Sequence, residues 1–307
     1  MPRVSVIIPT YNCARYLGQA IESVLNQTYA AKYVELIVVN DGSTDDTDEV
    51  IRPYRSRMTY ITQPNRGISG GRNGGVKVAT GDYVAFLDAD DYWLPERLAL
   101  MLKRAVASPD CMVMTDVFVL NERSGELETQ GNCEAKGLTP LFDLNARDQY
   151  VAALKANFLN YMIMVPRDVF ARVGLFDKSL TFGDDWDFEL RCLEAGMPVR
   201  LVPEPLAVYR LYRPGATTTR PDVSMAASRL RILEKHRTSV SAARWKTALG
   251  LRDSLLFQQA LQGRKFFFAT QIAVKLATNR AYGRHLLRQR ALARRLRVSA
   301  AADAAYR

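Results

Sequence analysis

The first 235 residues contain no histidine, and the whole chain has only His236 and His285. Acid–base chemistry in that long N-terminal part must therefore come from carboxylates, tyrosines or lysines. The four cysteines stand far apart, and no pair of them has the spacing of metal ligands. We expect reduced thiols rather than disulfides. The cysteines are Cys13, Cys111, Cys133 and Cys192.

The sequence also lacks a long hydrophobic run. No stretch reaches the roughly 18 apolar residues that are needed to span a bilayer. The first residues, "MPRVSVIIPTYN", enter a strand-like run at once and leave no room for the apolar core and cleavage site of a signal peptide. These absences predict a cytoplasmic protein with no spanning segment of its own.

Charge is distributed unevenly along an otherwise ordinary globular composition of 48% hydrophobic and 24% charged residues. The net charge is +10, yet the first 226 residues carry 24 basic and 29 acidic side chains. From Ala227 onward there are 18 Lys and Arg against 3 Asp and Glu. A Pro-, Gly- and Thr-rich break at 213–222 precedes this basic part. We therefore predict one domain at 1–222 and a basic, helical region at 223–307.

Apolar β-branched runs alternate with segments of helical periodicity through the first hundred or so residues. This alternation, with short connections, predicts a parallel, doubly wound α/β sheet. Ligands bind such sheets at the carboxyl ends of the strands, and polar turns follow three of these runs. Strands are expected at 4–10, 33–40, 58–63 and 82–88, a helix at 14–27, and a glycine-rich turn leading into a helix at 67–80.

The segment "AFLDADDY" ends a strand-like run with Asp88, Asp90 and Asp91. Alternate residues of a strand tip point to the same side, so we expect Asp88 and Asp90 to point together, while Asp91 orders the turn. Hard oxygen donors of this kind suit Mg²⁺ or Mn²⁺. A solvated acidic turn that caps the following helix remains the plain alternative.

Two further segments have both a functional and a structural interpretation. Asp41 in "VVNDGSTDDT" can accept hydrogen bonds from a nucleobase or ribose, although Asn-Asp-Gly-Ser is also ordinary turn chemistry. The glycines of "NRGISGGRNGG" let backbone amides approach a ligand, and Arg66 and Arg72 suit phosphate. This segment matches neither the dinucleotide nor the P-loop fingerprint, so an irregular turn is equally compatible with it.

The segment "FGDDWDFELR" brings four acids to an expected helix start. Acids stabilise helix N-termini through the dipole, which accounts for one or two of them. A carboxylate held among other carboxylates has a raised proton affinity, which favours a general base. The acids are Asp184, Asp185, Asp187 and Glu189.

Taken in order, these segments resemble the inverting glycosyltransferase family 2. The resemblance rests on "VSVIIPTYN", "VVNDGSTDDT", "NRGISGGRNGGVKVATGDYVAFLDADD" and "GDDWDFELR", and it covers about residues 3–215. It implies the GT-A fold, an α/β architecture with a Rossmann-like mixed sheet flanked by helices. The basic C-terminal helices would be an appendage to that fold.

The resemblance also implies roles for single residues on the donor side. The nucleoside pocket would be lined by Pro9, Thr10, Tyr11 and Asp41. Arg72 would reach the base or the diphosphate. Asp88 and Asp90 match the D-x-D motif that holds Mg²⁺ or Mn²⁺, with Asp90 as the direct ligand and Asp88 nearer the ribose or the metal.

On the acceptor side, Asp185 would be the catalytic base and Asp184 would support it or touch the acceptor. Trp186 is either a face for sugar stacking or a buried core residue. The implied reaction moves a sugar from a nucleotide-sugar donor, most often a UDP-sugar, to a hydroxyl of a glycan or lipid-linked glycan in cell-envelope polysaccharide synthesis. One displacement inverts the anomeric configuration, so no enzyme nucleophile is needed.

The chain departs from the family pattern after the last core strand. Many members carry a histidine where this sequence has Tyr212, so Tyr212 or Arg213 substitutes for it or the wall is a mobile loop. The alanine that usually precedes Arg-Asn is Gly71 here, which leaves the Arg72 assignment intact.

The basic region mixes Leu, Phe and Trp with Arg at helical spacing. Such helices either lie on an anionic membrane at the inner face, or pack on the catalytic domain or mediate homo-oligomer formation. No recognised motif for nucleic-acid binding accompanies the charge. Two other functions stay open for the chain. A sugar-nucleotide pyrophosphorylase usually has a Gly-rich loop where "TYNCARYL" stands, and a non-catalytic scaffold would use the basic region to recruit partners.

Overall fold

The computed structural model describes residues 1–155, 157–159, 162–212, 223–236, 238, 242 and 246. The chain divides into two compact units, Met1–Arg220 and Pro221–Arg307, and each is described by itself. In the second unit, α9 spans Val223–Lys235. The membrane or packing role predicted for the later basic helices lies outside the described residues. Within the described residues, no helix is both long and apolar enough to cross a bilayer.

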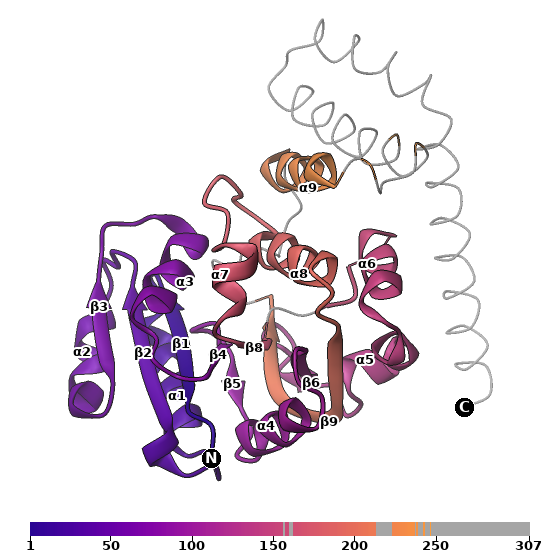
Figure 1. The fold of residues 1–307 in the computed structure, drawn as a ribbon. Helices are drawn as coiled ribbons and strands as arrows, with labels where there is room; N and C mark the ends of the chain where they lie inside the picture. The colour runs from indigo at the N-terminus through magenta and orange to yellow at the C-terminus, as the bar shows by residue number, and fades with distance from the viewer. Residues whose placement is uncertain are drawn as a thin grey trace, which may run out of the picture. The chain divides into compact units, whose positions relative to one another are not determined.

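In the described part of the first unit, nine strands form one mixed sheet in the order β3-β2-β1-β4-β8-β6-β9-β5, with β7 paired to β6 (Figure 1). The pairs β1–β2, β1–β4 and β2–β3 are parallel, whereas β8 runs antiparallel to both β4 and β6. Strands β6 and β9 also pair in parallel, whereas β5 pairs antiparallel to β9 and β7 antiparallel to β6. The purely parallel sheet expected from alternation is therefore wrong for the whole sheet, and the mixed sheet implied by the family resemblance is confirmed. The strands are β1 Val4–Thr10, β2 Val34–Asn40, β3 Thr59–Thr62, β4 Tyr83–Phe86, β5 Tyr92–Trp93, β6 Met112–Asn121, β7 Glu126–Leu127, β8 Met164–Pro166 and β9 Val199–Leu211.

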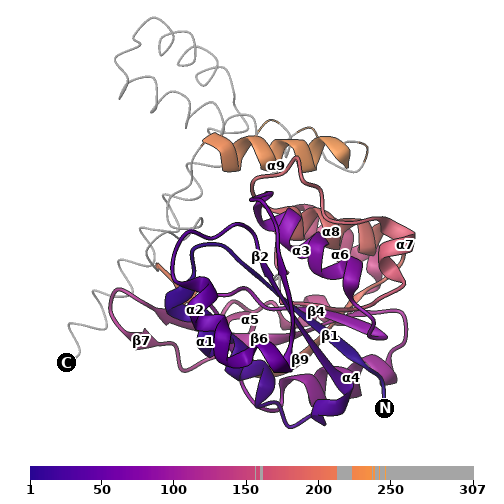
Figure 2. The same ribbon diagram turned by 90° about the vertical axis from the view of Figure 1, so that its left-hand side faces the viewer.

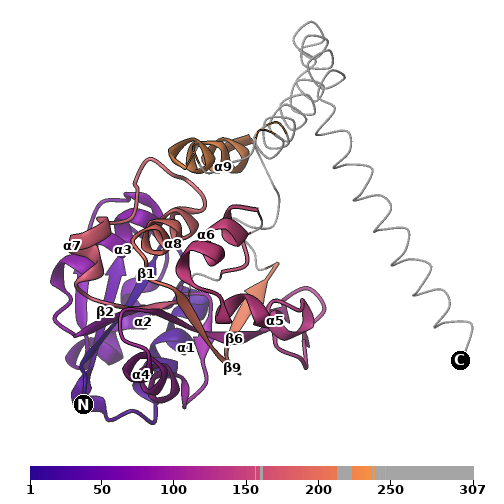
Figure 3. The same ribbon diagram turned by 45° about the vertical axis from the view of Figure 1, so that its right-hand side comes forward.

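Helices cover both faces of this sheet. Helices α3, α6, α7 and α8 lie over one face, and α1 and α4 lie over the other (Figure 2). Helix α6 lies beside α8 (Figure 3). The longer helices are α1 Ala14–Leu25, α3 Gly67–Val78, α4 Arg97–Ala107, α6 Ala146–Lys155 and α8 Asp184–Glu194. The shorter ones are α2 Thr47–Ile51, α5 Asn132–Ala135 and α7 Val169–Val173, with 3₁₀ turns at Ala31–Tyr33, Arg52–Arg57 and Thr139–Asp143.

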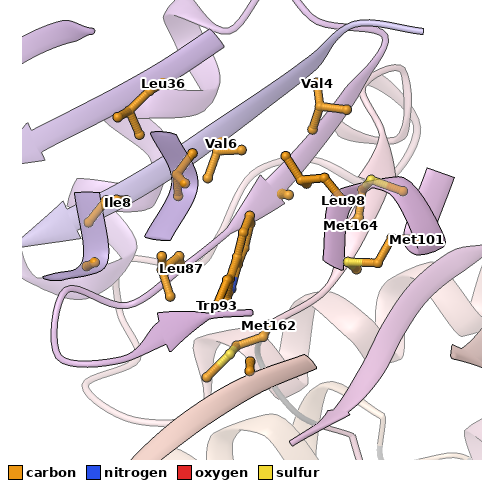
Figure 4. Packing of buried hydrophobic residues seen from close by; sticks show 14 of the residues in the cluster. Val4, Val6, Ile8, Leu36, Leu87, Trp93, Leu98, Met101, Met162 and Met164 are labelled. Carbon is orange, nitrogen blue, oxygen red and sulfur yellow. The ribbon is translucent and has the colours of Figure 1, made fainter. Parts of the chain in front are cut away.

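The central strand β1 explains how the two layers form. All its residues are buried, as expected for a strand that has helices on both faces. Val4, Val6 and Ile8 belong to the core that α1 and α4 cover, where they are joined by Leu98, Met101 and Trp93 (Figure 4). This packing fixes β1 firmly, and with it the polar residues that follow its carboxyl end.

The helix expected within 67–80 is present, but α3 already begins at Gly67, so the glycine-rich residues expected to form a turn are part of the helix. Three of its glycines, Gly71, Gly74 and Gly75, face strand residues of the sheet. A Cβ on Gly75 would overlap the side chain of Ile7, and a Cβ on Gly71 would lie 3.0 Å from Cβ of Pro9. The glycines therefore allow α3 to approach β1 closely, and this close approach brings Arg72 down to the edge of the sheet.

Candidate active site

The polar residues that follow β1 and β2 lie together at the carboxyl edge of the sheet, as the sequence predicted. Parallel pairing aligns Thr10 with Asn40. Beyond the strands, the backbone N–H of Asn12 donates to Oγ of Ser43 at 3.0 Å, and the N–H of Thr44 donates to Oδ1 of Asn12 at 2.8 Å. Asn12 has φ 48°, a left-handed conformation that asparagine tolerates better than most residues. One asparagine thus ties the two loops into a single rim.

Thr10 and Tyr11 present complementary chemistry on this rim. The side chain of Thr10 is buried, and its Oγ1 has no hydrogen-bond partner in the protein. Tyr11 is 51% exposed. Pro9 is buried one residue earlier and faces Gly71 of α3. A free hydroxyl beside an exposed aromatic ring can hydrogen-bond and stack against a nucleoside.

Asp41 is buried, and its carboxylate is bound by the protein itself. It accepts a hydrogen bond from Nε2 of Gln63 at 2.6 Å and from the backbone N–H of Arg66 at 2.9 Å. In this structure Asp41 therefore orders the segment that leads into α3. The bond to Gln63 was not foreseen, since a polar side chain 22 positions later gives no local signal.

The acidic segment after β4 is a turn and not a strand tip. Strand β4 ends at Phe86, and the backbone N–H of Asp91 donates to the carbonyl of Asp88 at 3.1 Å. The premise of a strand tip is therefore wrong, while Asp88 and Asp90 are both partly exposed and Ala89 between them is buried. Asp91 is buried and accepts the backbone N–H of Arg210 on β9 at 2.8 Å, so it orders the turn as expected.

Arg72 joins the two acidic motifs. Arg72 is 3% exposed. Nη2 pairs with Oδ1 of Asp88 at 3.1 Å, and Nη1 pairs with Oδ2 of Asp184 at 2.9 Å. Sequence reasoning placed Arg72 beside the donor and missed both partners. The cation among the carboxylates of this structure is an arginine on α3.

Helix α8 begins directly after Gly183, whose φ of 74° suits glycine, and presents Asp184 and Asp185 in its first turn. Burial raises the pKa of Asp185 to about 6, and the neighbouring Asp184 adds to the rise while Arg72 opposes it. Oδ1 of Asp185 accepts the backbone N–H of Trp186 at 2.7 Å. A carboxylate with this pKa is ionised at neutral pH and still holds a proton more tightly than usual, which suits a general base.

The other acids and the tryptophan of α8 have different surroundings. Asp187 is buried and pairs with Arg191 at 3.1 Å, which is a structural contact within the helix. Glu189 is 1% exposed, and burial followed by the charge of Asp185 raises its pKa well above the usual value. Trp186 is buried, which places it in the core rather than on an open stacking face.

The charge balance of the site fits a divalent cation. Asp88, Asp184 and Asp185 gather around Arg72, and Asp90 lies near enough to Asp88 to act on it. Burial raises the pKa of Asp88, Arg72 lowers it, and Asp90 and Asp184 raise it further. No cluster of three or more candidate ligands occurs among the described residues. Two carboxylates completed by phosphate oxygens are the usual way proteins hold Mg²⁺, so this donor set fits the ion.

Tyr212 occupies the position where many members of the resembled family have histidine. It follows β9, has φ 63° and is 37% exposed. The guanidinium of Arg123 lies 4.7 Å from the centre of its ring. Arg213, the other residue considered for this wall, lies outside the described residues.

Comparison with known proteins places the chain in a family. The model of glycosyl transferase family 2 matches residues 5–172. The uncharacterized glycosyltransferase RP339 of Rickettsia prowazekii is 32% identical over 192 residues, which are 61% of this chain and 57% of that protein. The uncharacterized glycosyltransferase EpsJ of Bacillus subtilis is 29% identical over 216 residues, 68% of this chain and 61% of that protein. The matches thus span about three fifths of these relatives.

Solved structures share the fold. TarS 1-349 of S. aureus in complex with UDP-GlcNAc has a TM-score of 0.58 at 18% identity, covering 94% of this chain and 92% of that one. The mannosyltransferase PcManGT of Pyrobaculum calidifontis in complex with GDP-Man and Mn²⁺ has a TM-score of 0.58 at 21% identity. The match covers 95% of this chain and 80% of that one. The expected GT-A architecture is therefore confirmed. The chain belongs to glycosyl transferase family 2.

Proposed function

We propose that this chain transfers a sugar from a nucleotide-sugar donor, a UDP-sugar, to a hydroxyl of a glycan or lipid-linked glycan, with inversion at the anomeric carbon. Residues 1–222 would be the catalytic domain. The observation that carries the proposal is the position of Asp185. Its carboxylate has a pKa raised to about 6 and is acted on by the charges of Asp184 and Arg72. Arg72 in turn pairs with Asp184 and with Asp88, which lies in the same turn as Asp90.

The donor would bind at the rim formed by the carboxyl ends of β1 and β2. Pro9, Thr10 and Tyr11 form one wall, and Thr10 offers a buried hydroxyl without a protein partner. Asp41 holds the second wall through Gln63 and Arg66. Asp88 and Asp90 would hold Mg²⁺ or Mn²⁺ together with the diphosphate oxygens, and the cation offsets charge on the departing nucleoside diphosphate.

Asp185 would accept the proton of the acceptor hydroxyl. The oxygen then forms a bond to the anomeric carbon from the side opposite the diphosphate, and the bond to the diphosphate oxygen breaks with its electron pair. This single displacement inverts the configuration. Asp184 supports Asp185, because its negative charge contributes to the raised pKa of its neighbour. Arg72 holds Asp184 and Asp88 in place, and its charge balances both.

Nucleotide binding tests the donor part of the proposal. Isothermal titration of the full chain with UDP, GDP, dTDP and CDP, each with and without Mn²⁺, should give Mn²⁺-dependent binding of UDP. Asp90→Asn should raise the Mn²⁺ concentration needed for UDP binding, whereas Asp46→Asn, a change at an exposed residue before α2, should not. Binding of no nucleoside diphosphate by the wild-type chain would contradict the proposal.

The basic region 223–307 would place the enzyme at an anionic membrane surface, where a lipid-linked acceptor is found. The proposal rests on its charge, 18 Lys and Arg against 3 Asp and Glu from Ala227 onward. Co-sedimentation with vesicles that contain anionic lipid should be lost when the chain is truncated after residue 226. Equal sedimentation of both forms would contradict this role.

A further inference from the structure

The segment before α8 is fastened to α3 by three hydrogen bonds that the reaction scheme does not use. Nδ2 of Asn73 donates to the carbonyl of Phe176 at 2.8 Å, and the N–H of Phe176 donates to Oδ1 of Asn73 at 3.0 Å. Oγ of Ser69 donates to the carbonyl of Asp177 at 3.1 Å. Asn73 and Phe176 are both buried. One amide side chain thus pairs with both backbone groups of Phe176, as a neighbouring strand would do.

The ring of Phe176 contacts β4, which precedes the Asp88–Asp90 turn, and α8, which bears Asp184 and Asp185. It packs edge-on against Phe86 of β4, two residues before Asp88, with 5.2 Å between the ring centres. It stacks on Phe188 of α8, one helical turn after Asp184, with 4.6 Å between the ring centres. The guanidinium of Arg72 lies 5.5 Å from the centre of the same ring. A displacement of Phe176 would therefore move the two acidic motifs relative to each other.

We propose that Asn73 and Phe176 are positioning residues that fix the distance between the metal-side carboxylates and the base on α8. The proposal rests on the proposed function, in which Asp185 and the Asp88–Asp90 turn act on one substrate complex. Neither residue touches the substrates. Asn73 holds the backbone of Phe176, Phe176 holds Phe86 and Phe188, and Arg72 completes the link by pairing with Asp88 and Asp184.

Asn73→Ala should separate the two motifs without touching the donor rim. The change leaves the N–H and carbonyl of Phe176 buried without partners, so the segment must shift to find others. A displacement of about 1 Å between reacting groups can lower a rate about 100-fold. We expect turnover to fall about 10- to 100-fold while the affinity for UDP stays within about twofold of wild type.

Gln149→Ala is the matched control. Gln149 is also buried and also pairs with both backbone groups of one residue: Nε2 donates to the carbonyl of Val199 at 2.9 Å, and the N–H of Val199 donates to Oε1 at 2.7 Å. It joins α6 to the start of β9, and its side-chain hydrogen bonds go to the backbone of Val199 and Leu141 rather than to the segment that precedes α8. Both variants should lower the melting temperature, and only Asn73→Ala should lower turnover. Asn73→Asp keeps an acceptor for the N–H of Phe176 but sets a buried carboxylate oxygen against its carbonyl, so it should be impaired at least as much as Asn73→Ala.

Titration of Asp185 provides a readout that does not depend on activity. Asp184 and Glu189 on α8, Arg72 on α3 and Asp88 after β4 are the charged groups that act on Asp185. The charge of Arg72 lowers the pKa of Asp185, so loosening the Arg72–Asp184 pair should weaken this effect and raise the pKa of Asp185. Carbon-13 NMR of labelled aspartate carboxyls, with Asp185→Asn to assign the signal, measures the midpoint in wild type, Asn73→Ala and Gln149→Ala.

The two measurements separate the two proposals. An upward shift of the Asp185 midpoint in Asn73→Ala but not in Gln149→Ala supports the positioning role. An unchanged midpoint in Asn73→Ala, or the same change in both variants, overturns that role even when the wild-type chain is active. Failure of the wild-type chain to bind any nucleoside diphosphate overturns the proposed function and leaves the NMR result to decide the positioning role alone.

Discussion

Replacement of Asp185 by Asn removes a carboxylate whose charge is opposed by burial and by Asp184, and it keeps an oxygen that can accept the N–H of Trp186. In the unfolded chain the pKa of this carboxyl is near 3.8, and in the folded chain it is about 6. The folded protein thus binds this proton more tightly than the unfolded chain does. Ionisation of Asp185 therefore costs stability, and the asparagine variant should be the more stable protein at neutral pH.

The size of the gain follows from that difference of about 2 pKa units, at about 1.4 kcal/mol for each unit. The upper limit is about 3 kcal/mol. Asp185 is partly exposed, and solvent screening reduces the expected gain to about 1–2 kcal/mol. The gain should be absent below about pH 3, where the carboxyl is protonated in both states. It should grow mainly between about pH 4 and pH 6, the range between the unfolded and folded pKa values, and be constant above about pH 7.

Urea unfolding of wild type and Asp185→Asn at pH 5, 6, 7 and 8 measures this gain. Asp110→Asn is the control for the loss of one negative charge, because the side chain of Asp110 is 78% exposed and makes only a 3.8 Å ion pair with Arg172. Asp185→Asn should also lose transfer activity by a factor of about 100 to 10,000. A gain that is equal at pH 5 and pH 8, or a loss of stability at pH 8, would refute the reasoning about the surroundings of Asp185.

Three further changes test the site and the fold. Arg72→Met leaves Asp184 buried without its cation, so thermal unfolding should show a loss of about 3–5 kcal/mol, and Arg72→Lys should show a smaller loss; no loss in Arg72→Met would contradict the pairing. Gly75→Ala places a methyl group against Ile7 and should cost about 1–3 kcal/mol in urea unfolding, whereas Gly18→Ala has ordinary space beside Val50 and should be neutral or slightly stabilising. Asp90→Asn should raise the Mn²⁺ concentration needed for half-maximal turnover at least about 10-fold, and an unchanged requirement would remove Asp90 from the metal site.

Local pattern was enough to predict the first half of the fold. The strands at Val4–Thr10 and Val34–Asn40 are apolar because helices cover both sheet faces, and such runs are visible in the sequence. The polar residues that end them were therefore placed at one edge correctly. The helix at α3 was expected, but its glycines were taken as a turn because glycine often marks turns, whereas here the missing Cβ atoms allow close contact with Ile7 and Pro9.

Long-range pairing was not predictable from one sequence. Arg72 and Asp184 are 112 positions apart, and Asn73 and Phe176 are 103 apart, so no local spacing links them. The sequence indicated four acids at the start of α8, but it did not indicate which of them meet Arg72 and which are packed inside. That division depends on how α3 and α8 pack over the sheet, and the tertiary structure alone determines it.

The pH dependence of turnover tests the central claim most directly. Release of nucleoside diphosphate from a UDP-sugar, measured with Mn²⁺ between pH 5 and 9, should give a profile of kcat/KM with an acid limb near pH 6, where Asp185 loses its proton. In Asp185→Asn the residual rate should be at least about 100-fold lower and should lack that limb. An Asp185→Asn variant that keeps wild-type turnover, or an unchanged acid limb in that variant, would contradict the assignment of Asp185 as the base.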